Sequence, residues 1–242
     1  MYSIETSLLT KKYKDVTAVD GLELKILEGE IFSLLGVNGA GKTTAIRMLA
    51  GLTEPTSGTA SVGGHDLISD GDRIKEIIAI SPQETAVAPG LSVKENLELI
   101  AGLFGFTKEH REEKVRELSE TFGLSSVLGK RAGKLSGGWQ RRLSIAMALI
   151  SEPRILFLDE PTLGLDVIAR SELWDVIRSL KGKATVILTT HYMEEAEALS
   201  DRIGIMKEGR LLTVGTAREI MDMTGKDRFE DAFISVVRGE SV

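Results

Sequence analysis

Apolar and polar positions follow different periods in successive parts of the chain, which indicates a mixed α/β fold. Up to about residue 62 short strand patterns dominate, such as the period-two alternation at 22–26. A Pro-Thr-Ser-Gly turn is expected at 55–58, before a strand at 59–62. These segments predict antiparallel strands in the first quarter of the chain.

Helical patterns replace the strand patterns between residues 91 and 150. At 93–104 and 109–122, charged residues are interleaved with Leu, Val and Ile at helical spacing. Strand-like runs resume at 155–158, 185–188 and 203–206, with helical segments at 169–180 and 192–199. Strands that alternate with helices predict a parallel sheet with crossover helices, and the middle segment is then a helical insertion.

A glycine-rich segment links the apolar run at 31–35 to an apolar helix pattern at 45–49. It consists of Gly36, Val37, Asn38, Gly39, Ala40, Gly41, Lys42 and Thr43, followed by Thr44. This is the phosphate-binding P-loop pattern in its required context of strand, loop and helix. Its glycines let backbone N–H groups turn inward, and the helix adds its positive end, so the segment favours an anion.

Two side chains of this loop predict a nucleotide ligand with a metal ion. Lys42 is expected to contact the β- and γ-phosphates, and the Thr43 hydroxyl is expected to hold Mg²⁺. On this motif alone, kinases, GTPases and motor ATPases all stay open.

A pair of carboxylates, Asp159 and Glu160, ends the apolar run at 155–158. Acids at the end of a buried strand need a cationic or catalytic partner. Asp159 is expected to hold the metal, directly or through water. Glu160 is expected to polarise the water that attacks the γ-phosphate. The alternative is a strand end with solvated acids.

A second glycine pair follows Ser136 and precedes an apolar helix pattern. Ser136, Gly137 and Gly138 would place another helix N-terminus where it can meet a phosphate. Taken alone, Ser136 is equally well explained as an N-cap. Together with the P-loop, segment 135–140 resembles the signature motif of ABC (ATP-binding cassette) transporters, although Trp139 stands where Gln or Met is commoner. The likeness to the nucleotide-binding domain of that family covers nearly the whole chain.

The resemblance implies a fold and a division of the chain. The fold is a P-loop NTPase (RecA-like) core with a parallel sheet, an antiparallel β subdomain and an inserted helical subdomain. Residues 1–242 then form one nucleotide-binding domain, with the core and the β subdomain at 1–83 and 155–224. The helical subdomain with the signature is expected at 84–154, and a C-terminal tail at 225–242.

The resemblance also assigns roles beyond the P-loop. Gln83 corresponds to the Q-loop residue and is expected to join Mg²⁺ and respond to a membrane partner. His191 corresponds to the switch histidine and is expected to contact the γ-phosphate of ATP. Tyr13 is expected to stack on adenine, with an ordinary half-buried strand aromatic as the alternative. The expected catalytic residues are thus Glu160, His191, Gln83 and Lys42, and the expected metal ligands are Thr43, Gln83 and Asp159.

The family mechanism implies partners. Two nucleotide-binding chains, identical or paralogous, would sandwich ATP head to tail, each P-loop facing the other chain's Ser136. A separate transmembrane permease subunit would carry the substrate. Segments 191–197 and 229–233 resemble ATPases of the ABC-2 exporter group, so export is expected. The alternative is a soluble non-transport ABC ATPase, which a single cassette without a sustained heptad run disfavours.

Composition and charge narrow the possible partners and the expected location of the protein in the cell. No stretch approaches the roughly 20 apolar residues of a membrane span, and no N-terminal signal peptide pattern is present. The absence of cysteine excludes disulfides and thiolate zinc sites. A net charge of -6 argues against a nucleic acid partner, so the basic positions at 130–142 are interpreted as a solvated face. A cytoplasmic protein attached peripherally to the membrane is expected.

Overall fold

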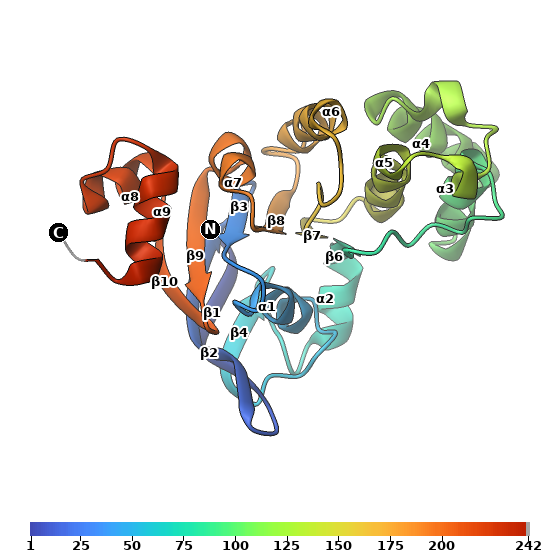
Figure 1. Cartoon of the computed structure of the whole chain (residues 1–242). Helices are drawn as coiled ribbons and strands as arrows, with labels where there is room; N and C mark the ends of the chain where they lie inside the picture. The colour runs from blue at the N-terminus through green and yellow to red at the C-terminus, as the bar shows by residue number, and fades with distance from the viewer. Residues whose placement is uncertain (241–242) are drawn as a thin grey trace.

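Two β-sheets meet around helix α1 in the computed structural model, which describes residues 1–240 (Figure 1). The larger has the strand order β10-β9-β3-β8-β7-β6, and the smaller has the order β2-β1-β4-β5. The strands are β1 (Tyr2–Tyr13), β2 (Val16–Leu27), β3 (Ile31–Leu35), β4 (Ser57–Val62), β5 (His65–Asp66), β6 (Ile78–Ser81), β7 (Ile155–Asp159), β8 (Thr185–Thr190), β9 (Arg202–Lys207) and β10 (Arg210–Gly215).

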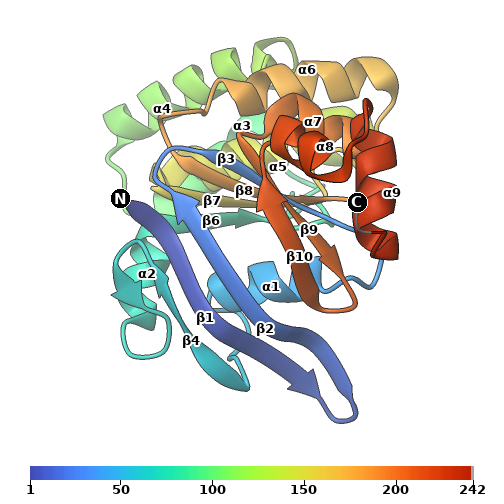
Figure 2. The same cartoon turned by 90° about the vertical axis from the view of Figure 1, so that its left-hand side faces the viewer.

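Helices cover both faces of the larger sheet. α6 and α7 lie over one face, and α1 lies over the other (Figures 1 and 2). The α-helices are α1 (Lys42–Leu49), α2 (Gly71–Ile77), α3 (Val93–Leu103), α4 (Lys108–Thr121), α5 (Gly137–Ala148), α6 (Val167–Arg178), α7 (Met193–Leu199), α8 (Ala217–Thr224) and α9 (Phe229–Arg238). Within residues 1–240, none of the helices combines the length and the apolar character needed to cross a bilayer.

The central strands of the larger sheet run parallel, as the sequence predicts. β3 pairs with β8 and β9, and β7 pairs with β6 and β8, all in parallel register. Every residue of β3, β7 and β8 is buried. Burial on both faces explains why these strands read as continuous apolar runs instead of alternating ones. The expected α/β fold with a parallel sheet and an antiparallel sheet is confirmed.

The smaller sheet is antiparallel and corrects one expectation. The turn predicted at 55–58 is wrong in its second half, because Ser57 and Gly58 belong to β4. A Cβ on Gly58 would lie 2.3 Å from the Leu8 carbonyl oxygen of β1, and Gly58 has a φ of 84°. The glycine therefore permits a close strand approach at a bulge, where the sequence pattern predicted a turn.

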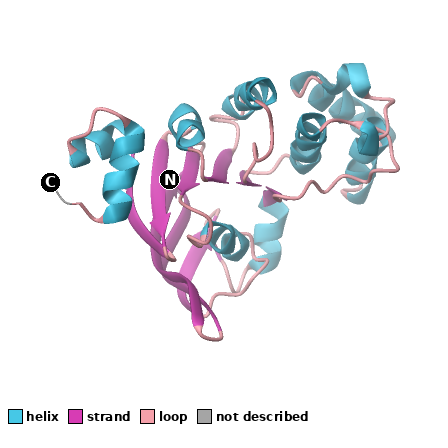
Figure 3. Cartoon of the chain, in the orientation of Figure 1, coloured by secondary structure: helices cyan, strands magenta, loops and turns pink. Residues whose placement is uncertain are grey.

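Helices α3, α4 and α5 form a lobe beside β6 and β7, called the helical lobe below. Figure 3 shows helices and loops there, between Ser81 and Ile155. α3 begins with a capping box, in which Ser92 Oγ accepts from Glu95 N and the Glu95 carboxylate accepts from Ser92 N. Its apolar side chains join a core with those of α5 and the face of the sheet covered by α6. The helical lobe therefore shares one hydrophobic core with strands β7 and β8.

The end of the chain packs against the other edge of the larger sheet. Phe229, Ala232 and Phe233 of α9 are buried against Ile203 and Ile205 of β9. The segment expected as a tail at 225–242 thus contains a packed helix, and its last two residues, 241 and 242, lie outside the described residues.

A buried amide on α3 holds the later part of the connection from β6 to α3, which gives the first prediction. Asn96 is fully buried; it accepts from Ala88 N at 2.8 Å and donates to Ala88 O at 3.1 Å. Asn96→Leu should lower the free energy of unfolding by about 2 kcal/mol, because both Ala88 groups lose their partner. Chemical denaturation measures this loss. Glu98→Ala on the same helix should change stability by less than about 0.5 kcal/mol, and an equal loss in both variants would contradict the assigned role of Asn96.

Candidate nucleotide site

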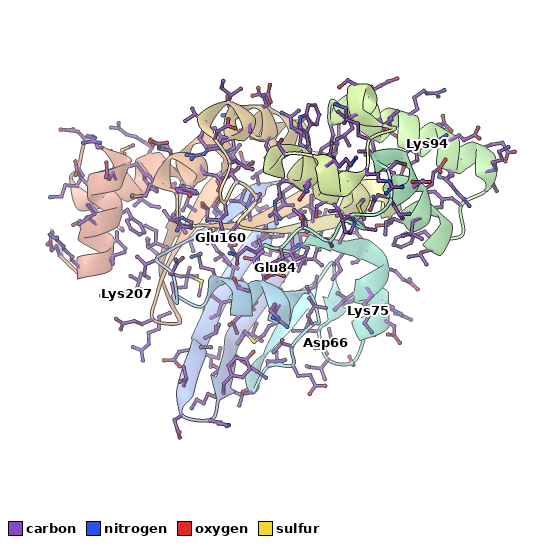
Figure 4. The ribbon with its side chains drawn as sticks, turned by 45° about the vertical axis from the view of Figure 1, so that its right-hand side comes forward. Asp66, Lys75, Glu84, Lys94, Glu160 and Lys207 are labelled. Atoms are coloured by element: carbon purple, nitrogen blue, oxygen red, sulfur yellow. The ribbon has the colours of Figure 1, made fainter. Side chains whose placement is uncertain are left out.

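The carboxyl ends of four parallel strands bring the predicted site residues to one edge of the sheet. β3 leads to Gly36, β6 to Gln83, β7 to Glu160 and β8 to His191. This edge is where ligands gather in parallel sheets. It opens into a cavity of about 700 Å³ lined by Val16, Thr17, Ala18, Asn38, Gly39, Ala40, Gly41, Lys42, Thr43, Thr44, Gln83, Glu160, Leu163, His191 and Glu208. Figure 4 shows Glu160 and Glu84 in the middle of the molecule, whereas Lys94 lies out on the helical lobe.

The P-loop has a backbone that only glycine accommodates at Gly41. Gly41 has a φ of 99° and precedes the first residue of α1. A Cβ there would lie 2.4 Å from the carbonyl oxygen of Ala18. The first turn of α1 carries no acidic residue, so the positive end of the helix faces the cavity uncompensated. The loop therefore provides the cradle for a phosphate that the sequence predicts.

Lys42 is buried under this loop. Its Nζ donates to Gly36 O at 2.7 Å and to Val37 O at 3.2 Å, and it lies 3.5 Å from Glu160 Oε1. Only 5 % of Lys42 is exposed. A buried ammonium held by carbonyls beside a cavity is available to a phosphate oxygen.

Glu160 adopts a left-handed conformation with a φ of 49°. For a residue other than glycine this costs roughly 1–2 kcal/mol. Its backbone N–H donates to both the carbonyl and the hydroxyl oxygen of Thr189, at 3.2 and 3.0 Å. On the side chain, Oε2 lies 2.5 Å from His191 Nδ1. The unusual backbone thus aims the carboxylate into the cavity, between Lys42 and the histidine.

Asp159 and Thr43 form the part of the site that fits a metal ion. Asp159 Oδ1 accepts from Thr43 Oγ1 at 3.1 Å and from Thr189 Oγ1 at 2.5 Å. Carboxylate and hydroxyl oxygens are the hard donors that Mg²⁺ prefers. Within residues 1–240 no cluster of three or more His, Cys, Asp or Glu side chains could hold a metal on its own. A metal here would therefore complete its shell with hydroxyl, amide and phosphate oxygens.

Some predicted ligands do not line the cavity. Tyr13 lies at the end of β1, is 47 % exposed and has Lys11 Nζ 5.1 Å from its ring centre, while Val16 of the same hairpin does line the cavity. Gly36 and Val37 also lie outside the lining. A Cβ on Gly36 would meet Met206 O at 2.4 Å, so this glycine is required for packing.

The predicted signature residues stand apart from the chain's own P-loop. Ser136, Gly137 and Gly138 begin α5 in the helical lobe and do not line the cavity. Ser136 occupies the N-cap position, but its side chain makes no cap hydrogen bond. The N-cap explanation thus leaves the hydroxyl unused, and both Ser136 and Gly137 are exposed.

Two residues that position the site were missed by the sequence reasoning. Thr189 holds Asp159 and Glu160, yet it belongs to a strand recognised by its apolar neighbours. Arg141 donates to Asp159 O at 2.7 Å and to Pro161 O at 2.8 Å from α5. A threonine on a buried strand gives no local signal, because its partners are distant in sequence. Arg141 is one of the basic positions interpreted as a solvated face, and that interpretation is wrong for this residue: it is only 4 % exposed, because carbonyl partners distant in sequence hold it inside.

Comparison with known proteins places the chain in a family. A model of the ABC transporter family matches residues 19–163. The chain is 42% identical to the daunorubicin/doxorubicin resistance ATP-binding protein DrrA of Streptomyces peucetius, over 93% of this chain and 68% of that protein. It is also 42% identical to the Nod factor export ATP-binding protein I of Burkholderia pseudomallei, over 90% of this chain and 72% of the relative.

A solved structure of a nucleotide-bound ATP-binding cassette has a similar fold. The dimeric ATP-binding cassette MJ0796 in a post-hydrolysis state, bound to ADP and Pi, has a TM-score of 0.79 and 28% identity, and the match covers 88% of this chain and 98% of that one. The chain belongs to the ABC transporter family and is an ATP-binding ATPase of that family. The resemblance to the exporter group is confirmed.

The second prediction concerns Lys42. Lys42→Ala should abolish ATP hydrolysis, because the cation beside the phosphate cradle is lost while the fold around it is retained. Steady-state phosphate release measures the effect. Lys75→Ala, an exposed lysine paired with Asp72 on α2, is the control and should hydrolyse ATP at the wild-type rate. Near wild-type hydrolysis by Lys42→Ala would contradict the site assignment.

Proposed function

We propose that this chain is the ATP-hydrolysing subunit that drives substrate export by a separate transmembrane permease. The observation that carries the proposal is the placement of Glu160, which the sheet edge holds between Lys42 of the P-loop and His191. A carboxylate aimed into a phosphate cradle suits the activation of an attacking water.

The chemical roles follow from this geometry. Lys42 binds the β- and γ-phosphates as a fixed cation. Glu160 accepts a proton from the attacking water, and His191 orients the Glu160 carboxylate through Nδ1 and contacts the γ-phosphate. Thr43, Asp159 and Gln83 are the residues that would hold Mg²⁺, which neutralises phosphate charge when bound. The remaining loop residues, Asn38 to Gly41 and Thr44, bind phosphate through their backbone and hydroxyl groups, and Tyr13 would stack on adenine once its hairpin closes over the base.

A second copy of the chain, or a paralogue, would complete the site. Ser136, Gly137 and Gly138 form the N-terminus of α5 outside their own cavity, with Ser136 and Gly137 exposed and Gly138 partly buried. Facing the P-loop of a partner head to tail, they would contact the γ-phosphate from the other side. ATP then stabilises the closed pair, and hydrolysis removes the differential affinity for it. The dimeric state of the similar ADP-bound cassette supports this arrangement.

Export and membrane attachment rest on the relatives. One is named for drug resistance and another for Nod factor export, which supports outward transport of organic compounds. The chain would attach peripherally to the cytoplasmic face, where closure of the pair moves the permease. A purified complex with the permease, assayed for substrate-stimulated ATPase activity in vesicles, tests the proposal. ATPase activity that no permease alters would favour a non-transport ATPase.

The third prediction separates two neighbouring carboxylates. Glu160→Gln should retain ATP and Mg²⁺ binding but lose about 10²-fold or more in hydrolysis, because a positioned base is removed. It should then accumulate as an ATP-bound dimer, measured by light scattering. Asp159→Asn should weaken Mg²⁺ binding instead. If Glu160→Gln hydrolyses ATP normally, Glu160 is not the base.

The fourth prediction tests the composite site. Ser136→Arg chains keep their P-loop, and Lys42→Ala chains keep their signature. A mixture of two inactive variants should regain ATPase activity, because a mixed pair contains one intact composite site. Each variant alone, at the same total concentration, is the control. A mixture as inactive as its components would count against the head-to-tail pair.

A further inference from the structure

Arg141 is a buried cation whose partners are all backbone carbonyls. It is 4 % exposed and lies on α5, one turn after the helix begins. Nε donates to Pro161 O at 2.8 Å and Nη2 to Asp159 O at 2.7 Å. Nη1 donates to Pro82 O and, at 3.3 Å, to Gln83 O. One guanidinium from the helical lobe therefore holds two separate segments of the nucleotide site.

The energetics of this group indicate a role other than stability. Burial lowers the pKa of Arg141 to about 10, while the charges of Asp159, Glu195 and Glu160 oppose that change, so the group is protonated at neutral pH. No salt-bridge partner of Arg141 exists among residues 1–240. A buried charge held only by neutral carbonyls costs more desolvation energy than an apolar side chain of its size. The hydrogen bonds of Arg141 therefore fix the positions of its carbonyl partners at some cost to the stability of the fold.

The hydrogen bonds from Arg141 to Asp159 O and Pro161 O lie on either side of Glu160. Asp159 O and Pro161 O belong to the residues on either side of Glu160, which has the left-handed φ of 49°. Such a conformation persists only where surrounding contacts over-determine it. Thr189 fixes the Glu160 N–H, and Arg141 fixes the two flanking carbonyls. Without the guanidinium, the backbone on both sides of Glu160 loses one of its anchors.

The remaining bonds connect the same side chain to Gln83. Nη1 holds the Pro82 and Gln83 carbonyls at the start of the connection from β6 to α3. α5 itself begins directly after Ser136. A rigid rotation of the helical lobe would therefore either move these carbonyls with it or break the bonds.

We propose that Arg141 is a positioning residue that couples the orientation of the helical lobe to the catalytic geometry of Glu160 and Gln83. This inference rests on the proposed function, because it acts through the Glu160 carboxylate. Arg141 touches neither ATP nor water in this role; it sets where Glu160 and Gln83 stand.

The test separates positioning from folding and from binding. Arg141→Met keeps the length and removes the donors, and misplacement by about 1 Å costs on the order of 10²-fold in kcat. ATP affinity, measured by equilibrium binding with the metal chelated, should change less than about threefold, because the P-loop is untouched. Lys114→Met removes another buried cation of the helical lobe, one paired with Glu117 and Glu152, and should leave kcat unchanged.

A conservative variant keeps the inference falsifiable if Arg141→Met does not fold. Arg141→Lys retains the charge, but one ammonium cannot bridge the carbonyls on both sides of Glu160. It should fold and lose roughly tenfold in kcat with unchanged ATP affinity. A wild-type kcat in Arg141→Lys, or a parallel loss of kcat and affinity in both Arg141 variants, overturns the inference.

A double-mutant cycle distinguishes this inference from the proposed function. If Arg141 acts through Glu160, Arg141→Lys should cost clearly less single-turnover hydrolysis in a Glu160→Gln background than in wild type. Equal losses in both backgrounds overturn the coupling. Normal hydrolysis by Glu160→Gln alone would overturn the proposed base instead, whatever Arg141 does.

Discussion

The register of the parallel strands is the constraint on which the nucleotide site depends. Leu35 is paired with Thr190, and Asp159 with Thr189, so β3, β7 and β8 end at the same level. Neighbouring strands lie about 4.8 Å apart. The loops that follow them therefore bring P-loop residues, Glu160 and His191 to the lining of one cavity. A shift by one residue would turn Asp159 to the opposite face of the sheet and separate it from Thr43.

Strands and site residues could be predicted from the sequence where an apolar run or a motif is continuous along the chain. The apolar runs at 31–35 and 155–158 mark buried strands, because both of their faces are covered. The P-loop after the first run and the two acids after the second, Asp159 and Glu160, are then located by their positions in the sequence. Strand β6 was not singled out: it has four residues, and only Ser81 among them is classed as buried. Its place beside β7 depends on partners more than seventy positions away.

Other features of the site escape prediction for a physical reason. Thr189 and Arg141 act through backbone carbonyls and hydroxyls that are distant in sequence, so no spacing rule reveals them. The sequence analysis expected Ser136 to face the P-loop of a second chain and Tyr13 to stack on adenine, and both residues lie outside the cavity lining of their own chain.

Backbone groups do most of the positioning at this site, and that has a consequence for its mechanics. Among residues 1–240, the ion pairs at the cavity edge are those of Glu160 with Lys42 and with His191, and these side chains can exchange the contacts for phosphate oxygens. The backbone contacts of Arg141 and Thr189 involve none of these charged side chains, so an exchange of the ion pairs for phosphate does not itself require these contacts to break. The site thus combines exchangeable charged side chains with a fixed backbone frame. Arg141 belongs to the helical lobe and holds the backbone on both sides of Glu160. A movement of the lobe can therefore shift Glu160 without any change in the P-loop.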